Sequence, residues 1–434
     1  MKGVCFPRRV SWVLAAVLTL SVSARAEDLL QVYAQARASD PVLAGAAAQR
    51  GQQQELSTQA RAALLPQWSL DYSDSRAQQD GGRTQDLNSR VSQVLIDLGK
   101  LRSWDAAEAQ LSAQDARVRA AEQQLCARVA SVYFGVLSAE ASLATAIANE
   151  DAFAQQVAQA QSRFEAGLSA QLDVDQARAY RELARGGTLQ AREALADARE
   201  ALAQLTGQMP GKLKPLTALL QAQPPAPQDA QAWVEQALQG NPTLQAYALQ
   251  LRASEQRIAA AGAAHLPTLS LGLDSERRSG SAVAPADAGR MVSTVALRLN
   301  IPLFAGGATE SQKRQAVYQR DAAREDMEVS RRALVRETQA QYQAVQTSLL
   351  QIASGQAAVK AADQMLAATR AGQTLGTRSM TDLLLAIQTQ SNAQNALQQA
   401  RHRYVLATLL LQQAAGRLGE AELAQVNQLL MENT

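Results

Sequence analysis

The apolar positions of this sequence follow two different periods. Over much of two stretches, 66–97 and 267–303, every second residue is apolar, and the alternation is clearest from Met291 to Leu303. A period of two places successive side chains on opposite faces of a β-strand. Ser89 and Gln93 interrupt the apolar face of the second strand. The pattern predicts four strands of about ten residues each, paired as two β-hairpins.

Most of the remaining chain predicts long helices. Two segments of about 68 residues, starting near Gly99 and Gly306, contain no proline and are rich in alanine and glutamine. A straight helix of that length spans about 100 Å. Each segment ends at a turn that contains glycine, Gly167 or Gly376, and a second helical segment follows. We expect two helical hairpins that are too long for one compact domain.

The chain contains two copies of one sequence unit. Leu65 and Pro66 recur as Leu266 and Pro267 after 201 residues, whereas residues farther along, such as Tyr133 and Tyr342, recur after 209. The second copy has therefore gained about eight residues, and the composition of 279–290 predicts that they form a surface loop.

The repeat defines the predicted organisation. It consists of a first repeat at 27–206 with strands at 66–97 and a helical hairpin at 99–206, a linker at 207–227, a second repeat at 228–416 with strands at 267–303 and a helical hairpin at 306–416, and a C-terminal tail at 417–434.

Residues 1–26 are typical of a secretory signal peptide. Basic residues precede an apolar run from Val10 to Val22, and Ala24 and Ala26 supply the small residues of a cleavage site. The run is too short to span a membrane. We expect the exported chain to begin at Glu27, and no later run of 18 apolar residues predicts a transmembrane helix.

Composition excludes several classes of function. The whole chain has a net charge of +2, and the signal segment carries four basic and no acidic residues, so the exported part has a net charge of −2. This charge gives no support for a nucleic-acid partner. Two histidines and two cysteines, far apart, leave little material for a metal site. Since no nucleophile, phosphate-loop or paired-carboxylate motif is present, we expect neither an enzyme nor a cofactor.

Export and strand pattern together favour an outer-membrane β-barrel. Strands of about ten residues with one apolar face suit such a barrel. The alternative is two water-soluble hairpins that each pack one face on a helix. Four strands cannot close a barrel, and lipid does not tolerate an open sheet edge. Several chains must then contribute strands, and three chains would supply 12.

Four segments in order carry a resemblance to a known family. They are Glu27 to Tyr33, His265 to Leu269, Pro302 to Gly307 and Gly376 to Asp382. With this layout the chain resembles the TolC family of trimeric outer-membrane channel proteins, which serve type I secretion and tripartite drug efflux. The resemblance covers nearly all of the exported chain.

The resemblance implies a mainly helical homotrimer with a transmembrane β part. Its 12-stranded β-barrel, four strands per chain, would lie in outer-membrane lipid and continue into a 12-helix α-barrel that crosses the periplasm. The tail would join a belt around the helices. A periplasmic adaptor protein and an inner-membrane transporter, ABC-type or proton-driven, would dock at the inner end. The sequence does not distinguish protein toxins from small molecules as cargo.

The resemblance also assigns roles near the inner tip. Asp382 matches an acidic ring that constricts the pore, and Leu385 stands where the family has a second acidic ring. Asp382 also has a local interpretation that does not exclude this one, because Ser379 and Asp382 have the spacing of a helix-capping box. Three residues match the network that holds the entrance closed: Asp173, Arg378 and Arg401. Four match the turns that contact the adaptor: Gly167, Leu168, Gly376 and Thr377.

A second functional class remains open. A periplasmic coiled-coil adaptor or scaffold without a barrel would also need a signal peptide and long helical hairpins. The alternating strands argue against it.

Overall fold

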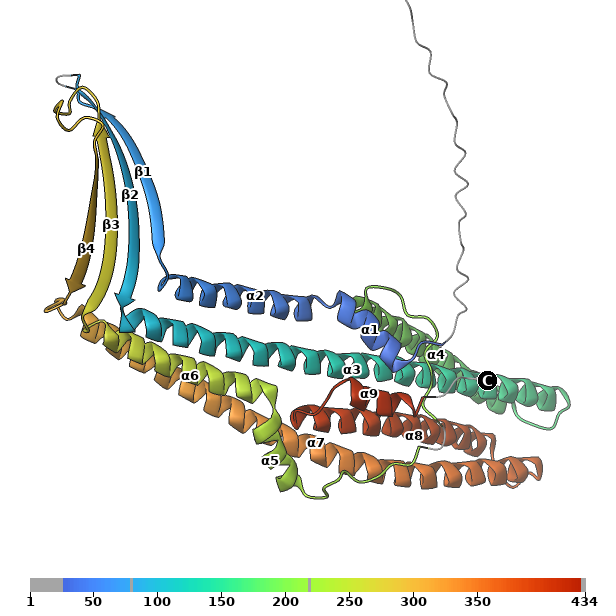
Figure 1. Ribbon diagram of the computed structural model, residues 1–434. Coiled ribbons are helices and arrows are strands. Elements are labelled where there is room, and N and C mark those ends of the chain that lie inside the picture. Colours follow the sequence, from blue (N-terminus) through green and yellow to red (C-terminus); the bar gives the residue numbers. More distant parts are fainter. Residues whose placement is uncertain (1–25, 79–80, 218–219, 431–434) are drawn as a thin grey trace, which may run out of the picture.

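The computed structural model describes residues 26–78, 81–217 and 220–430. The predicted signal peptide, 1–26, lies almost wholly outside these residues. Long helices fill most of the molecule, and a small sheet stands at one end (Figure 1). The helices of the first repeat are α1 (Leu29–Ser39), α2 (Pro41–Ala62), α3 (Leu98–Glu165) and α4 (Gln171–Thr206). The second repeat and the tail contribute α5 (Ala230–Gly240), α6 (Pro242–Ala263), α7 (Ala308–Thr374), α8 (Met380–Ala414) and α9 (Glu420–Asn427).

The two repeats begin in the same way. At the start of α2, Asp40 accepts a hydrogen bond from the backbone N–H of Leu43, and a proline occupies the first helical position. Asn241 caps α6 in the same manner. Proline at this position costs no helical hydrogen bond, and a polar cap satisfies an orphan N–H group. The Asp40 carboxylate is buried and pairs with Arg128 at 2.7 Å, which fixes the bend between α1 and α2.

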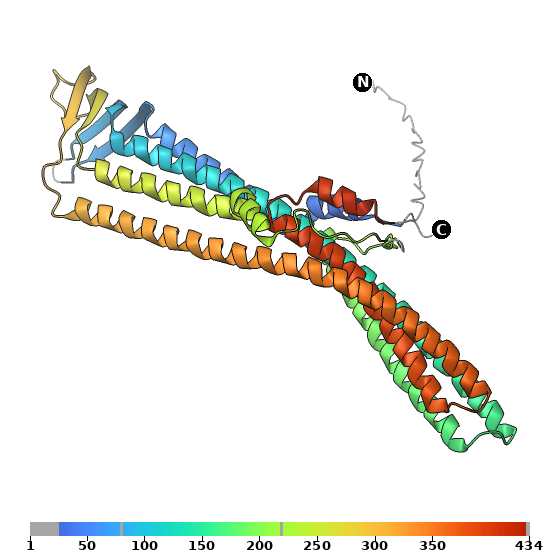
Figure 2. The same cartoon turned by 90° about the horizontal axis from the view of Figure 1, so that it is seen from below.

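The long helices α3 and α7 have 68 and 67 residues. α2 and α6 pack beside their halves nearest the sheet, and α4 and α8 return along the other halves. Figure 2 shows these helices side by side along the length of the molecule. α3 contains an 18-residue window apolar enough by composition to cross a membrane, although the sequence predicted no such helix after residue 26. The same helix packs against α4, α6 and α8 along its length.

The sheet is antiparallel, in the order β1-β2-β3-β4. Its strands are β1 (Gln67–Arg76), β2 (Arg83–Ile96), β3 (Thr268–Ser279) and β4 (Met291–Asn300). Both hairpin connections lie at the end of the sheet farthest from the helices (Figure 1). The two outer strands, β1 and β4, have ten residues each.

One face of the sheet is apolar and open. Trp68 is 75% exposed and Leu297 is 64% exposed. The polar residues that interrupt this face have partners: the Trp68 Nε1–H donates to Ser89 Oγ at 2.9 Å, and Gln93 Nε2 donates to the carbonyl of Leu64 at 2.9 Å. Their polarity is therefore satisfied within the protein, which removes the cost of placing them on an apolar surface.

The opposite face carries charge in pairs. Asp274 on β3 accepts from Arg90 on β2 at 2.5 Å and lies 3.5 Å from Arg298 on β4. The three side chains join three neighbouring strands across one face. We call this the polar face.

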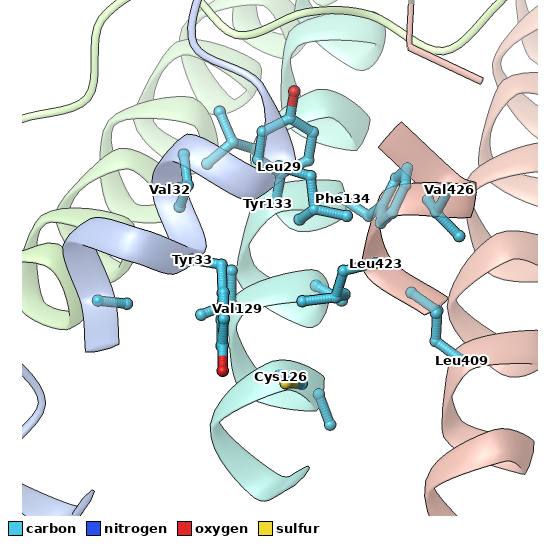
Figure 3. Close-up of a cluster of buried hydrophobic side chains, with 14 of the residues drawn as sticks. Leu29, Val32, Tyr33, Cys126, Val129, Tyr133, Phe134, Leu409, Leu423 and Val426 are labelled. Carbon is cyan, nitrogen blue, oxygen red and sulfur yellow. The ribbon is translucent and has the colours of Figure 1, made fainter. Parts of the chain in front are cut away.

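A belt of buried side chains joins α1, α3, α8 and α9 (Figure 3). The Tyr133 hydroxyl in this cluster donates to the carbonyls of Lys214 at 2.9 Å and Glu27 at 3.2 Å. The linker between the repeats thus crosses the belt, and the tail pairs with it through Leu216 and Leu430.

Candidate functional site

The two helical hairpins turn at the same end of the molecule, opposite the sheet (Figures 1 and 2). At the first turn Gly167 has a φ of +73°, and the Leu168 N–H donates to the carbonyl of Arg163 at 2.8 Å. At the second turn Gly376 has a φ of +75°, and the Thr377 N–H donates to the carbonyl of Gly372 at 2.8 Å. A left-handed glycine followed by such a bond is the usual end of a helix.

The turns present apolar side chains to the surroundings. Leu168 is 70% exposed and Leu375 is 79% exposed. A β-carbon added at Gly167 or Gly376 would meet no atom within 4 Å. The four residues assigned to the adaptor, Gly167, Leu168, Gly376 and Thr377, therefore form open turns with space around them.

Asp382 forms the predicted capping box with Ser379. The Asp382 N–H donates to Ser379 Oγ at 3.1 Å, and the Ser379 N–H donates to Asp382 Oδ2 at 3.0 Å. The hydrogen bond from the Ser379 backbone N–H to the carboxylate lowers the pKa of Asp382, with further contributions from the Ser379 side chain and the charge of Arg378. Within one protomer the helix cap thus acts against the rise in pKa that repulsion among three carboxylates would produce.

Leu385 is one turn beyond Asp382 on the same side of α8 and is 58% exposed. An exposed leucine needs a reason only when it recurs as a patch, and three copies around one axis would make such a patch. The acidic position and the apolar position thus follow each other along the helix.

Arg378 lies across the end of α7. A β-carbon at Gly372 would be 2.7 Å from Arg378 Cγ and 3.2 Å from Thr377 Oγ1. The absence of a side chain at Gly372 therefore lets the stem of Arg378 pass. Sequence reasoning missed this glycine, because a glycine inside a helical pattern usually signals only weaker helix propensity.

Asp173 stands in the first turn of α4, half-buried. Across the residues that the structure describes, no ion pair of a single protomer joins Asp173 to Arg378. A different contact ties the two hairpins together here: Thr381 Oγ1 donates to Gln176 Oε1 at 2.9 Å.

The structure does not bring Arg401 to this end of the molecule. Arg401 follows Asp382 by 19 residues on α8, a rise of roughly 28 Å. Its guanidinium donates to the carbonyl of Thr217 in the linker and to Gln398 Oε1. The predicted grouping of Arg401 with Asp173 and Arg378 is therefore not a direct contact. Within the protomer Arg401 joins α8 to the belt.

A buried apolar cluster makes the tips one unit. It unites α3, α4, α7 and α8 through Phe153, Ala160, Val174, Ala177, Leu366, Met380, Leu383, Leu384, Ala386 and Ile387. Because all four helices contribute, the two turns are held at a fixed separation. The described part of the chain contains no group of three or more His, Cys, Asp or Glu residues placed to hold a metal ion.

Comparison with known proteins identifies the family. The family model described as outer membrane efflux protein matches residues 32–208 and 233–417. The chain belongs to the outer membrane efflux protein family. The two matched ranges correspond to the two repeats. Outer membrane protein TolC of Vibrio cholerae is 34% identical over 424 residues, which cover 96% of this chain and 97% of that protein. Alkaline protease secretion protein AprF of Pseudomonas aeruginosa is 28% identical over 96% of this chain and 91% of that protein.

Solved structures have the same fold as this family member. The channel CusC aligns with a TM-score of 0.80 at 21% identity over 90% of this chain and 92% of that chain. The outer membrane protein VceC of Vibrio cholerae aligns with a TM-score of 0.79 at 21% identity over 89% of this chain and 96% of that chain. The predicted fold class, long helical hairpins with four strands per chain, is confirmed.

Proposed function

We propose that three copies of this chain form an outer-membrane exit duct. The duct passes substrates from an inner-membrane pump and a periplasmic adaptor protein to the outside of the cell. The barrel lies in the outer membrane, and the helices extend into the periplasm.

The observation that carries this proposal is the open sheet. Its edge strands, β1 and β4, have ten residues each and no neighbour on their outer sides within the described chain. Unpaired backbone groups cannot face lipid. In the order β1 to β4, the outer strands run in opposite directions, so β4 of one copy can pair antiparallel with β1 of the next. Three copies close a barrel of 12 strands.

The two faces of the sheet fit a barrel wall. The apolar face, with Trp68 and Leu297 exposed, suits lipid, and the polar face with its Arg90–Asp274 pair suits a water-filled lumen. A periplasmic adaptor or scaffold without a barrel would leave this apolar face in water. The channel is therefore favoured over that alternative.

The tips supply the inner end of the duct. Asp382 and Leu385 form the proposed constriction. Asp173 and Arg378, on separate hairpins, hold the closed entrance through contacts between neighbouring helices, and Arg401 supports it from the belt. The exposed turns at Gly167 and Gly376 contact the adaptor. An ABC-type or a proton-driven transporter completes the assembly.

The names of the relatives indicate the class of cargo but no particular molecule. One relative is called a protease secretion protein and another, from Brucella suis, an outer membrane efflux protein. Type I protein secretion, drug efflux, or both are the activities that this duct serves.

Cysteine cross-linking tests the trimer. With Cys126 replaced by serine, one cysteine on β1 and one on β4, scanned along both strands, should give cross-linked dimers and trimers in outer-membrane fractions. A protein that stays monomeric in detergent, and forms no such cross-link at any register, would contradict the proposal.

Tip variants test the adaptor contact. Gly376→Trp and Gly167→Trp should abolish export and leave trimers in the membrane. Gly81→Trp is the matched control, because Gly81 also has a positive φ of +69° and open space but lies at the opposite end. Normal export by the Gly376 variant would remove these turns from the contact surface.

A further inference from the structure

The second hairpin has a long connection that the proposed function does not use. Residues 280–290, eleven in number, join β3 to β4, whereas 77–82 suffice between β1 and β2. The connection is five residues longer than the first one, 11 against 6, and so accounts for most of the about eight residues that the second repeat has gained. Figure 1 shows it at the end of the sheet farthest from the helices.

The loop folds over one face of the sheet. A cavity of about 520 Å³ lies between the loop and the strands. Its loop wall includes Ala282, Val283, Ala284 and Asp287, and its strand wall includes Thr84, Asp86, Glu276, Arg278 and Val292.

The strand wall belongs entirely to the polar face. Asp86 lies opposite Arg278, and Glu276 lies opposite Val292. Side chains alternate between faces along a strand, so these residues share the side of Arg90 and Asp274 and oppose the side of Leu297. The loop therefore bends toward the face that lines the lumen in the proposed barrel.

Three hydrogen bonds, one to a side-chain hydroxyl and two between backbone groups, fix the loop in this position. The Arg83 N–H donates to Ser281 Oγ at 3.0 Å, and the Ala282 N–H donates to the carbonyl of Arg83 at 3.1 Å. The Gly289 N–H donates to the carbonyl of Arg278 at 2.6 Å. The loop is thus tied at both ends, to β2 and to β3.

Gly280 makes the close approach possible. Its φ is +121°, and a β-carbon at this position would overlap the carbonyl oxygen of Arg83. Only glycine fits such a conformation and such a contact. The inward fold of the loop therefore depends on this one residue.

The charges beneath the loop are paired but not fully neutralised, because one arginine lies between two carboxylates. Arg278 lies 2.6 Å from Glu276 and 3.3 Å from Asp86. The loop itself contributes one acidic residue, Asp287, and one basic residue, Arg290. The residues that line the cavity therefore carry a net charge of −1 per copy, three acidic against two basic. We attribute the main effect of the loop on passing molecules to its bulk.

We propose that the 280–290 loop is an inward-folded lid at the outer mouth of the duct, and that its three copies set the size limit for molecules that enter the barrel from outside. The inference rests on the proposed function, because it requires a closed barrel with the polar face inside. This size limit is separate from the constriction at Asp382, which lies at the other end of the molecule.

The test measures access to the lumen from outside intact cells. In a Cys126→Ser background, Thr294→Cys places a thiol on the polar face, and Leu297→Cys places one on the apolar face. Cells are treated with a small charged maleimide or with polyethylene-glycol maleimides of increasing size. With the native loop, the small reagent should label Thr294→Cys and the large reagents should not.

Two loop variants then test the lid. Deletion of residues 282–287 should let larger reagents label Thr294→Cys while the small reagent labels at an unchanged rate. Gly280→Ala should do the same. Gly289→Ala is the matched control, because Gly289 has a φ of +76° but its nearest neighbour is 3.8 Å away. If Gly280→Ala fails to assemble, the deletion variant alone shows whether the loop sets the size limit.

The outcomes separate the two proposals. An unchanged size limit in the deletion variant would overturn the lid, even with the barrel intact. Equal labelling of Leu297→Cys and Thr294→Cys by the small reagent would instead show that the sheet does not form a barrel wall.

Discussion

Gly372 and Arg378 are in contact at the end of α7, where the stem of the arginine occupies the space that a side chain at residue 372 would take. They are six positions apart in the sequence, and the left-handed Gly376 reverses the chain between them. The position of Arg378 at the tip thus depends on a residue that carries no charge.

The first prediction concerns this pair. Gly372→Ala should displace Arg378 and weaken the closed entrance. Single-channel conductance in planar bilayers should therefore rise, and we expect the same rise for Arg378→Ala. Alanine stabilises a helix by about 1 kcal/mol relative to glycine. A weaker closed entrance in this variant would therefore not result from a less stable helix. Gly186→Ala is the control, because Gly186 is also helical and has no atom within 4 Å of its β-carbon position. Unchanged conductance in the Gly372 variant would show that the contact has no part in closure.

The second prediction separates the two roles of Asp382. Asp382→Asn should lower cation selectivity, because three carboxylates around one axis attract cations. Ser379→Ala breaks the capping box and leaves the carboxylate charge in place, so its selectivity should stay near that of the wild type. If the two variants behave alike in bilayer recordings, Asp382 is a helix cap without a role in selectivity.

Leu385 gives a third prediction at the same constriction. The wild type should be only weakly blocked by divalent or trivalent cations, since one acidic ring is present. Leu385→Asp should strengthen the block, because two acidic rings one turn apart can hold one hydrated ion together. Blocking curves in planar bilayers measure this, and an unaltered curve for Leu385→Asp would place this position away from the pore axis.

A fourth prediction tests the faces of β4. Leu297→Lys should reduce the amount of assembled protein, because a lysine at a mid-membrane site on the lipid side costs about 2–4 kcal/mol. Thr294→Lys should assemble normally, since it faces the proposed lumen. Heat-resistant trimers on gels report both, and the reverse result would invert the assignment of the faces.

The last prediction concerns pH and His402. This side chain is buried between α3 and α8, with its Nδ1 2.9 Å from Ser138 Oγ. Burial, with help from the charge of Arg401, lowers the pKa of His402 to about 4. The unfolded chain takes up the proton near pH 6.5 and the folded chain only near pH 4, so stability is complete above pH 6.5 and falls between these values. The free energy of unfolding falls by at most about 3 kcal/mol per protomer over this pH range.

Melting curves at pH 7 and pH 5 would measure this effect. The matched variant is His402→Gln, which keeps a hydrogen-bonding side chain and cannot titrate. It should lose part of the pH dependence. An identical pH dependence in the variant would assign the effect to other groups.

Much of the fold could be predicted because its signals are local and repeated. The alternation around Leu297 and the proline after Asp40 depend on neighbours in sequence. Ser89 interrupts the alternation of the second strand, but its partner, Trp68, lies on another strand and is 21 residues away. A pairing of this kind requires the register of the sheet, which sequence periodicity does not contain.

The contacts of the candidate site were harder to predict from the sequence for a similar reason. The capping box of Ser379 and Asp382 was readable because it spans four residues. The surroundings of Arg401 were not, since its partner Thr217 lies 184 residues away in a linker without regular periodicity. Gly372 was missed because its role depends on the path of a side chain that follows the turn.

The two ten-residue edges of the sheet also constrain how the protein is made. A newly exported protomer exposes both edges in the periplasm, where any extended chain can pair with them. In the proposed trimer, one copy with a damaged β1 or β4 leaves an edge unpaired in the whole ring, and the two intact copies cannot repair it. Barrel closure and membrane insertion thus become a single event that waits for the third subunit, and a defective allele would be dominant over an intact one.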